Sequence, residues 1–595
     1  MEREDNMKYY CNPINVHYFY QVRKTPAGDK ARVSRSAADF SLIEYKGRYY
    51  VFASGIHGIW ASDDLVNWEQ HPLPEGLPIH QTAPDVRVLN DYVYFCASGR
   101  GSACDRYRTK DVLNGPYERI EGTFDYWDPN LFADDDGRVY FYWGSSNVTP
   151  IWGVELDPET MIPKGERVVL MKAHPDEIGY ERFGENNSRT PKTPEEGEAL
   201  FKESLKKHGI KEEDVSESEK VFRIATLRDE PYIEGVWVDK YKGKYYLQYA
   251  APGTEFNVYS DAVYVSDKPL GPYTLAENNP FSYKPGGYFP GAGHGSTLLD
   301  HQGNWWHIST MRISLNELFE RRAGLWPSGF DADGELFCNQ RYGDWPTRVS
   351  GGLDDAWRNP EWMLLSSGKA VSASSYDEGH APELAVEEDV QTFWRAGSAS
   401  REEWLKVDLG KVFDVHAVQI NFSDDEIEIP LPVPDDAPLF TQWKLEASVD
   451  GAEWFTVCDK SDAQTDLSHD FIVSEEGYQA RYVRLSNIAV PYGKQPSVSG
   501  LRIFGFGDGK APAAPAFEAV RVSDLDMDVT IEGQEDTVGY NVLFGSSEDK
   551  LYHSWMVFKP GTLRVGSLIK GRNYVVRVDA FNENGITEGT VLKTV

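Results

Sequence analysis

Four carboxylic acids and one histidine stand at comparable places in five diverged copies of one short sequence unit. In each copy a polar residue precedes an apolar run, and a turn with Gly, Asn or Asp leads into an aromatic run. The polar residues are Asp39, Asp85, Asp128, Glu234 and His294. Carboxylates that share a cleft repel one another, so their pKa values are driven apart. One can then act as a base while a neighbour stays protonated as an acid, which is the pair that glycoside hydrolysis requires.

A repeat architecture has to position these residues. The stretch 232–250 is predicted to form two strands, because the turn Tyr241-Lys-Gly-Lys244 separates two runs rich in Val, Trp, Tyr and Leu. The copies that begin at 39, 85 and 128 lie about 45 residues apart, close to the length of a four-stranded propeller blade. The first strand of each blade lines the central axis of a propeller. We therefore expect the five polar residues to surround one pocket at one end of that axis, although any one Asp at a strand start could equally be a cap or turn residue.

The composition restricts the class of partner. The 595 residues carry a formal charge of -34, which argues against nucleic acid or an anionic membrane as a partner and is compatible with a neutral carbohydrate. Hydrophobic residues make up 41% of the chain, and no apolar run of 18 residues that could span a membrane occurs. Five scattered cysteines lack the pattern of a disulfide framework or a metal site.

The first residues, Met1-Glu-Arg-Glu-Asp, contain no apolar segment of a signal peptide. This predicts a cytoplasmic location for the sequence as it stands, or a secreted or periplasmic one if a leader has been removed. The sequence leaves the oligomeric state open.

Several motifs in the first 348 residues occur in one order along the chain. They are Ala38-Asp39 before Gly47-Arg-Tyr-Tyr50, Ser62-Asp-Asp-Leu-Val-Asn-Trp68, Ala83-Pro-Asp-Val86, Asp128-Pro-Asn-Leu-Phe-Ala-Asp-Asp-Asp-Gly137, Glu234-Gly235 and Gly293-His-Gly-Ser296. Together they resemble the five-bladed propeller of glycoside hydrolase family 43. The resemblance implies hydrolysis with inversion of configuration. It also implies that Asp39 is the general base, Glu234 the general acid and Asp128 the residue that tunes the pKa of the acid.

The resemblance extends to residues that contact substrate. Arg321 matches an arginine that contacts the substrate or the acid, although Arg322 is adjacent and leaves the choice open. Trp60, Asp85 and Trp237 complete the predicted substrate-binding residues. The chemistry requires no cofactor, but the family often holds a calcium ion in the central channel. His294 then has two interpretations, as a direct ligand or as a structural or water-mediated neighbour, because one imidazole is a poor partner for a hard cation.

A charged insert, residues 174–220, separates the third and fourth copies, and its segment Glu195 to His208 has helical spacing. Inserts of this size either shape a site from the rim or remain solvated decoration. Both interpretations stay open.

The whole chain is predicted to be all-β. A five-bladed propeller (1–348) and a connector (349–365) precede a β-sandwich (366–506). The sandwich resembles the discoidin, or factor 5/8 type C, domain, a group that includes carbohydrate-binding modules. It is predicted either to bind carbohydrate or to act as a structural brace. A linker (507–516) leads to a second sandwich (517–595) that resembles fibronectin type III.

These features predict an enzyme that releases a terminal pentose from plant-type polysaccharides or oligosaccharides. α-L-Arabinofuranosidase is the first choice, β-xylosidase the second, and exo-β-galactosidase or galactanase a third. The alternative from another class is a non-catalytic carbohydrate-binding protein. It would be expected to lack one of the three carboxylates Asp39, Asp128 and Glu234, all of which are present.

Overall fold

The computed structural model describes residues 8–25, 28–74, 77, 82–99, 102–182, 192–317, 319–349, 356–425, 427–433 and 437–595, and the backbone alone of Ser218. Strands dominate these residues, so the prediction of an all-β fold is confirmed. Part of the predicted connector, residues 350–355, lies outside the described residues. No helix in the described part of the chain is both long and apolar enough to cross a membrane.

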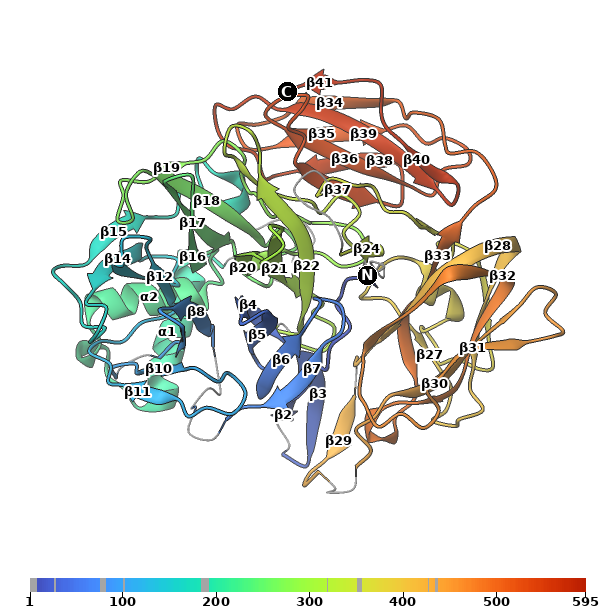
Figure 1. Ribbon diagram of the computed structural model, residues 1–595, viewed down its shortest axis with the longest axis horizontal. Helices are drawn as coiled ribbons and strands as arrows, with labels where there is room; N and C mark the ends of the chain where they lie inside the picture. Colours follow the sequence, from blue (N-terminus) through green and yellow to red (C-terminus); the bar gives the residue numbers. More distant parts are fainter. Residues whose placement is uncertain are drawn as a thin grey trace, which may run out of the picture.

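Five four-stranded sheets form the blades of a propeller, and in each sheet the strands follow the order of the chain. The blades are β4 (Ala38–Tyr45), β5 (Arg48–Ser54), β6 (Gly58–Ser62) and β7 (Glu69–Pro72); β8 (Asp85–Leu89), β9 (Tyr92–Cys96), β10 (Arg106–Thr109) and β11 (Glu118–Ile120); β12 (Asn130–Ala133), β13 (Val139–Trp143), β14 (Ile151–Leu156) and β15 (Val168–Met171); β16 (Glu234–Tyr241), β17 (Lys244–Ala251), β18 (Ser260–Ser266) and β19 (Thr274–Leu275); and β20 (Gly293–Leu299), β21 (Trp305–Arg312), β22 (Arg321–Phe330) and β23 (Leu336–Cys338). The innermost strands β4, β8, β12, β16 and β20 gather around the middle of the propeller (Figure 1).

Short pairings outside the blades tie distant segments together. β1 (Tyr9–Tyr10) pairs with β24 (Thr347–Arg348). The hairpin of β2 (Phe19–Lys24) and β3 (Lys30–Ser36) precedes the first blade. Its strand β3 also pairs with β29 (Glu428–Pro430), which belongs to the next domain. Figure 1 shows β29 extending beside β3.

The insert between the third and fourth blades forms two helices, α1 (Pro194–His208) and α2 (Glu217–Leu227). Thr193 caps α1 in a reciprocal capping box with Glu196, and Gly209 ends it in the left-handed conformation. The predicted helix at Glu195 to His208 is thus confirmed, whereas α2 was not predicted.

An eight-stranded assembly forms the middle domain. Its strands are β25 (Met363–Leu364), β26 (Ala370–Ala373), β27 (Trp394–Arg395), β28 (Leu405–Phe422), β30 (Gln442–Ser448), β31 (Phe455–Asp459), β32 (His469–Ala489) and β33 (Ser497–Phe506). Trp394 and Trp443 are fully buried in its core. Trp394 is therefore a core residue of this domain.

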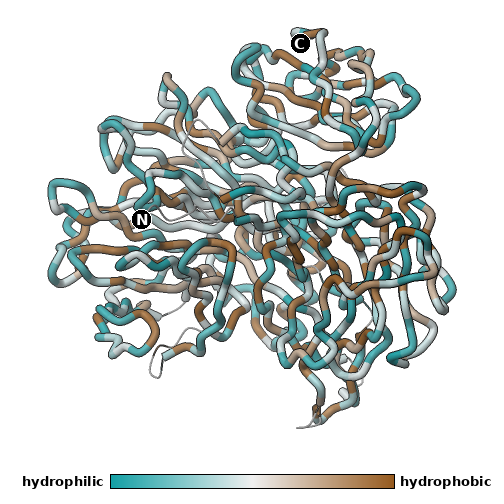
Figure 2. Tube along the Cα trace, turned by 45° about the vertical axis from the view of Figure 1, so that its right-hand side comes forward, coloured by the Kyte–Doolittle hydropathy of each residue, from teal (hydrophilic) through white to brown (hydrophobic). Residues whose placement is uncertain are grey.

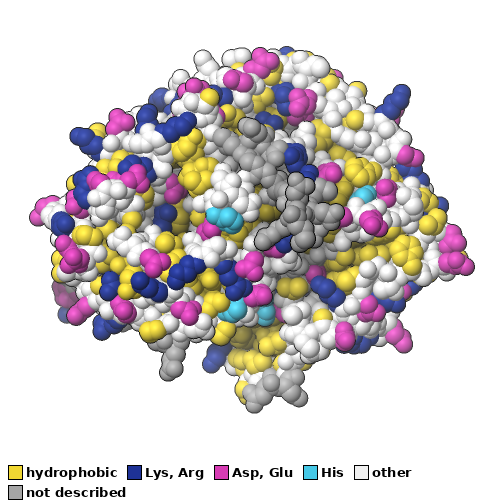
Figure 3. All heavy atoms as spheres, in the orientation of Figure 1, with side chains coloured by type: hydrophobic (Ala, Val, Ile, Leu, Met, Phe, Trp, Pro, Cys, Tyr) yellow, Lys and Arg dark blue, Asp and Glu magenta, His cyan; other side chains and the backbone are white. Residues whose placement is uncertain are grey.

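The last domain is a sandwich of two sheets. One contains β34 (Phe517–Arg521), β35 (Met527–Ile531) and β38 (Gly561–Val565), and the other contains β36 (Gly539–Gly545), β37 (His553–Val557), β39 (Val575–Asn582), β40 (Gly585–Thr587) and β41 (Lys593–Thr594). Residues of both sheets share one apolar core. Apolar stretches run through all three parts of the molecule, while polar residues predominate on the outer loops (Figure 2). On the face in Figure 3, basic and acidic side chains are interspersed over the surface.

Candidate active site

A left-handed backbone position recurs at the start of each inner strand, either one residue inside the strand or two residues before it. The residues that occupy it are Asp39 (φ 55°), Ala83 (φ 50°), Asp128 (φ 50°), Gly235 (φ 63°) and His294 (φ 48°). In β4, β16 and β20 a register shift follows this position directly. Such a bulge re-aims side chains at the end of a strand. The shared conformation defines the true register of the five copies.

Two residues after the left-handed position, side chains of the first two blades accept hydrogen bonds from the next blade. Asp85 Oδ2 accepts a hydrogen bond from the Leu131 backbone at 2.7 Å, and its Oδ1 accepts one from Asn130 Nδ2 at 2.8 Å. Ser41 Oγ does the same for the Val86 backbone at 2.9 Å. The prediction that Asp85 contacts substrate is therefore corrected. It was aligned two residues out of register: Ala83 has the left-handed conformation in its blade, and the neighbouring Thr82 lines the cavity.

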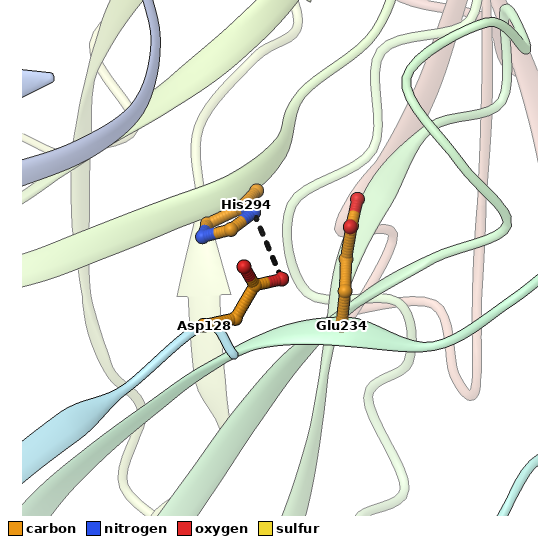
Figure 4. A group of neighbouring side chains, drawn as sticks. All are labelled: Asp128, Glu234 and His294. Carbon is orange, nitrogen blue, oxygen red and sulfur yellow. Dashed lines mark ion pairs between the residues drawn. The ribbon is translucent and has the colours of Figure 1, made fainter. Parts of the chain in front are cut away.

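Five of the predicted site residues line one cavity of about 580 Å³: Asp39, Asp128, Glu234, His294 and Arg321. His294 Nδ1 lies 3.4 Å from Asp39 Oδ1 and 3.9 Å from Asp128 Oδ2. Figure 4 shows the Asp128 carboxylate directed at the His294 ring, with Glu234 rising beside them from β16. Residues more than 250 positions apart in sequence are thus brought together at the propeller axis.

Asp39 is held in its ionised form. Burial by itself would raise its pKa, but the charges of His294 and Arg321 outweigh burial, and the pKa is lowered. Arg321 Nη1 lies 3.5 Å from Asp39 Oδ1. The hydroxyl of Thr310 accepts a hydrogen bond from the Asp39 backbone at 2.8 Å and fixes the start of β4. A buried carboxylate in this state is suited to accept a proton.

Glu234 is held in its protonated form. Burial and the neighbouring Asp128 charge raise its pKa from 4.5 to about 8. Its Oε1 accepts a hydrogen bond from the Tyr259 hydroxyl at 2.5 Å, and its Oε2 accepts one from Ser145 at 3.3 Å. Burial also raises the pKa of Asp128, to about 6, and the Gly235 backbone donates to Asp128 Oδ2 at 3.3 Å. The pKa values of Asp39 and Glu234 are thus shifted in opposite directions, as an acid and base pair requires.

The structure shows which of the two adjacent arginines, Arg321 and Arg322, faces the cavity. Successive residues of a strand face opposite sides. Arg321 accordingly faces the cavity, whereas Arg322 is fully buried and donates from Nε to His469 Nε2 at 2.8 Å. Of the two candidates, Arg321 is the one in position to contact a ligand.

Two predicted aromatic contacts are also corrected. Trp60 belongs to the apolar core of the first blade, where its indole donates to the His17 carbonyl at 3.1 Å. Trp237 stacks against the Arg87 guanidinium, which lies 3.3 Å from its ring centroid. Both indoles are at most 4% exposed, so they stabilise the propeller rather than line the cavity.

Sequence reasoning missed part of the cavity wall. Helix α2, which extends past the predicted end of the insert at residue 220, contributes Phe222 and Thr226, and Asp229 and Glu230 follow α2 along the chain. The hairpin β2–β3 contributes Gln21 and Arg23. The described residues of the predicted insert, 174–220, do not line the cavity themselves. Helix α2 begins in the insert, and the part of α2 beyond residue 220 shapes the site. The helical spacing of α2 (Val221, Phe222, Ala225) was a usable signal for its existence, but not for its position.

The expected calcium can be tested against the donor set. Asp128, Glu234 and His294 form a group, within the described residues, whose ligand atoms lie within 4.8 Å of one another. They offer two carboxylates and one imidazole, and the Glu234 carboxyl retains its proton to about pH 8. Calcium prefers six to eight oxygen ligands. His307 of β21, another buried histidine of the propeller, has its Nε2 paired with Asp261 Oδ2 at 2.9 Å. These residues do not fit a resident calcium ion.

An Asp with a lowered pKa and a Glu with a raised pKa in one cavity form the kind of pair that glycosidases with two carboxyl groups use. The family model "Glycosyl hydrolases family 43" matches residues 32–204 and 199–336, which together cover half of the chain. The chain belongs to this family, and the protein is a glycoside hydrolase. A second family model, the F5/8 type C domain, matches residues 370–499.

Two characterised proteins are similar to this chain at low sequence identity. The chain is 28% identical over 272 residues to xylosidase/arabinosidase 43A of Humicola insolens, covering 43% of this chain and 73% of that protein. It is 28% identical over 172 residues to a β-xylosidase of Xylanibacter ruminicola, covering 28% of this chain and 45% of that protein. A solved glycoside hydrolase shares 18% identity at a TM-score of 0.43, covering 79% of this chain and 97% of that one. The family 43 protein BlXynB from Bacillus licheniformis shares 16% identity at 0.38, covering 98% of each chain.

Proposed function

We propose that this enzyme is an exo-acting, inverting glycosidase that releases a terminal pentose, with α-L-arabinofuranosides and β-D-xylosides as the two substrate classes. The observation that carries the proposal is the opposed protonation of Asp39 and Glu234 in one cavity. The names of the two curated relatives, a xylosidase/arabinosidase and a β-xylosidase, support the choice of sugars.

In the proposed mechanism Asp39 removes a proton from a water molecule, whose oxygen attacks the anomeric carbon. Glu234 donates its proton to the glycosidic oxygen as the bond to the anomeric carbon breaks. Asp128 acts on Glu234 through its charge, which keeps the acid protonated, and Arg321 orients Asp39. At the end Asp39 holds the proton and Glu234 is ionised, so solvent exchange restores both. Inverting enzymes place the two carboxyl groups roughly 6.5–9.5 Å apart to leave room for the water.

Exo action is proposed because the cavity is walled on several sides. Its lining includes residues of α2 and of the segment after it, residues of the hairpin β2–β3, and Phe319. These walls come from segments outside the regular blades. A cavity of about 580 Å³ has the size of a site for a small ligand.

The experiment that tests this function is hydrolysis of aryl α-L-arabinofuranoside, β-D-xyloside and β-D-galactoside by the full chain, with the anomer of the first product followed by NMR. We expect turnover of one pentoside with inverted configuration. Preference for the galactoside would contradict the proposed sugar, and retention would contradict the mechanism. Glycan binding without any product would favour the non-catalytic alternative.

The proposed roles predict a bell-shaped pH dependence of kcat/KM. Activity requires ionised Asp39, whose pKa is lowered from 3.8, so it is lost only in strong acid. Activity also requires protonated Glu234, so it falls as pH rises through about 8. The measurement is the kcat/KM profile on one aryl pentoside. An alkaline limb near 4.5, the ordinary pKa of a glutamic acid, would contradict the assignment of Glu234 as the acid.

A further inference from the structure

A buried polar network joins the propeller to the discoidin-like domain. Arg35 of β3 donates to both carboxylate oxygens of Asp424 and from Nη1 to Asp466 Oδ1 at 2.7 Å. Arg322 of β22 donates to His469 Nε2, and its Nη2 lies 3.4 Å from Asp424 Oδ2. All five side chains are at most 2% exposed. Asp424 therefore links two propeller strands through one carboxylate.

His469 takes part in this network as a neutral base. Burial and the nearby charges of Arg322 and Arg35 hold its pKa well below 6.5. Its Nδ1 lies 2.7 Å from the amide oxygen of Asn421, which can only accept, so the proton resides on Nδ1. Nε2 is then free to accept from Arg322. The discoidin-like domain thus presents an acceptor of fixed orientation to β22.

The same network reaches the backbone that supports the cavity. Arg322 Nη1 donates to the carbonyl of Arg35 and, at 3.1 Å, to that of Arg321. The Arg321 carbonyl also accepts from the backbone of Ala37 at 3.2 Å, two residues before Asp39. β3 and the first residues of β22 are therefore connected at the point from which Arg321 extends toward Asp39.

We propose that the discoidin-like domain is a positioning element of the active site: Asp424 and His469 hold β3 and β22 so that Arg321 faces Asp39. This inference rests on the proposed roles of Asp39 and Arg321. It assigns to the domain a task in catalysis that does not depend on carbohydrate binding. It also accounts for the additional strand β29, which pairs with β3 on the same side of the interface (Figure 1).

The test compares His469→Ala and His469→Gln with Asp470→Ala in the full chain. Asp470 is the next residue of β32, is equally buried, and contacts Asn15 and Lys460 instead of β3 or β22. We expect His469→Ala to lower kcat/KM about tenfold or more, because small displacements of positioning groups have effects of this order. His469→Gln should recover part of the loss, since its amide oxygen can accept from Arg322. Asp470→Ala should stay within about twofold of wild type, as expected for a group remote from the site.

The pH profile distinguishes positioning from general loss of stability. The titratable and charged groups that face Asp39 are His294, Arg321, Asp128 and Glu234. If His469→Ala moves Arg321 away, Asp39 loses a stabilising charge and the acidic limb of kcat/KM shifts to higher pH. Asp470→Ala should leave this limb unchanged. A folded His469 variant with wild-type kcat/KM and a wild-type acidic limb would overturn the inference.

Hydrogen exchange provides a readout that does not require turnover. We expect faster amide exchange in residues 30–37 and 321–324 of His469→Ala, and wild-type exchange there in Asp470→Ala. A wild-type enzyme that cleaves none of the glycosides would contradict the proposed function, and exchange would then still decide the positioning inference. Should His469→Ala fail to fold, the His469→Gln variant is measured in the same way, and unchanged activity, acidic limb and exchange in that variant would overturn the inference.

Discussion

Replacing Glu234 with glutamine is expected to lower kcat on natural pentosyl linkages by about 10³-fold, within the range for loss of a general acid. Glutamine keeps the size and the contact with Tyr259 but cannot donate the proton that the glycosidic oxygen needs. Aryl glycosides with acidic phenols need little protonation, so they should lose much less. The measurement is kcat across aryl pentosides of graded leaving-group pKa, where the variant should show a steeper dependence than the wild type.

Glu181→Gln is the matched control for this variant. Glu181 is also a buried glutamic acid, with a pKa raised by burial to about 7, and it also accepts from a tyrosine, Tyr249 Oη at 2.6 Å. Glu181 lies in the described residues 174–182 at the start of the insert, called here its stem, and it does not line the cavity that contains Asp39, Asp128 and Glu234. Its replacement should leave the leaving-group dependence unchanged. Equal losses on all leaving groups in Glu234→Gln would argue that Glu234 is not the acid.

The repeat could be predicted from sequence because each blade combines an apolar inner strand with a turn at a fixed offset. That offset was sufficient to bring Asp39, Asp128, Glu234 and His294 to one end of the axis. It failed at Asp85 because a sequence pattern places the start of a strand only to within a few residues. Aligning Ala83-Pro84 with Asp128-Pro129 would have matched Ala83, rather than Asp85, to Asp128 and placed Asp85 between the blades.

Other parts of the site left no local signal. Trp60 is an aromatic residue on β6, the third strand of its blade, and such a residue packs between blades as readily as it lines a cavity. Arg35 resembles a solvent-facing charge in a hairpin, yet its partner Asp424 lies 389 residues further along the chain. Contacts of this kind depend on how domains dock, which a sequence pattern with period two does not encode.

The two C-terminal domains support different walls of the cavity. The discoidin-like domain contacts β3 and β22, as described above. The last domain holds the stem of the insert: Gly179 donates to the Leu568 carbonyl at 2.7 Å, and Arg182 donates to Asp526 Oδ1 at 2.9 Å. The stem leads to the helices whose α2 lines the cavity. Both C-terminal domains thus contact segments that lead to the cavity wall, and both pack closely on the propeller (Figure 1).

Replacing Asp39 with asparagine is expected to lower kcat by about 10³-fold for every leaving group alike, because activation of water is needed whether or not the departing oxygen requires a proton. The charge of Asp39 also raises the pKa of Glu234. Any residual activity should therefore lose its alkaline limb at a lower pH than the wild type. Asp85→Asn is the matched control, since it makes the same change at the start of an inner strand but faces the next blade. We expect it to lower the melting temperature while kcat is retained. An Asp39→Asn enzyme that lost activity only on poor leaving groups would instead assign Asp39 to protonation, and the two roles would have to be exchanged.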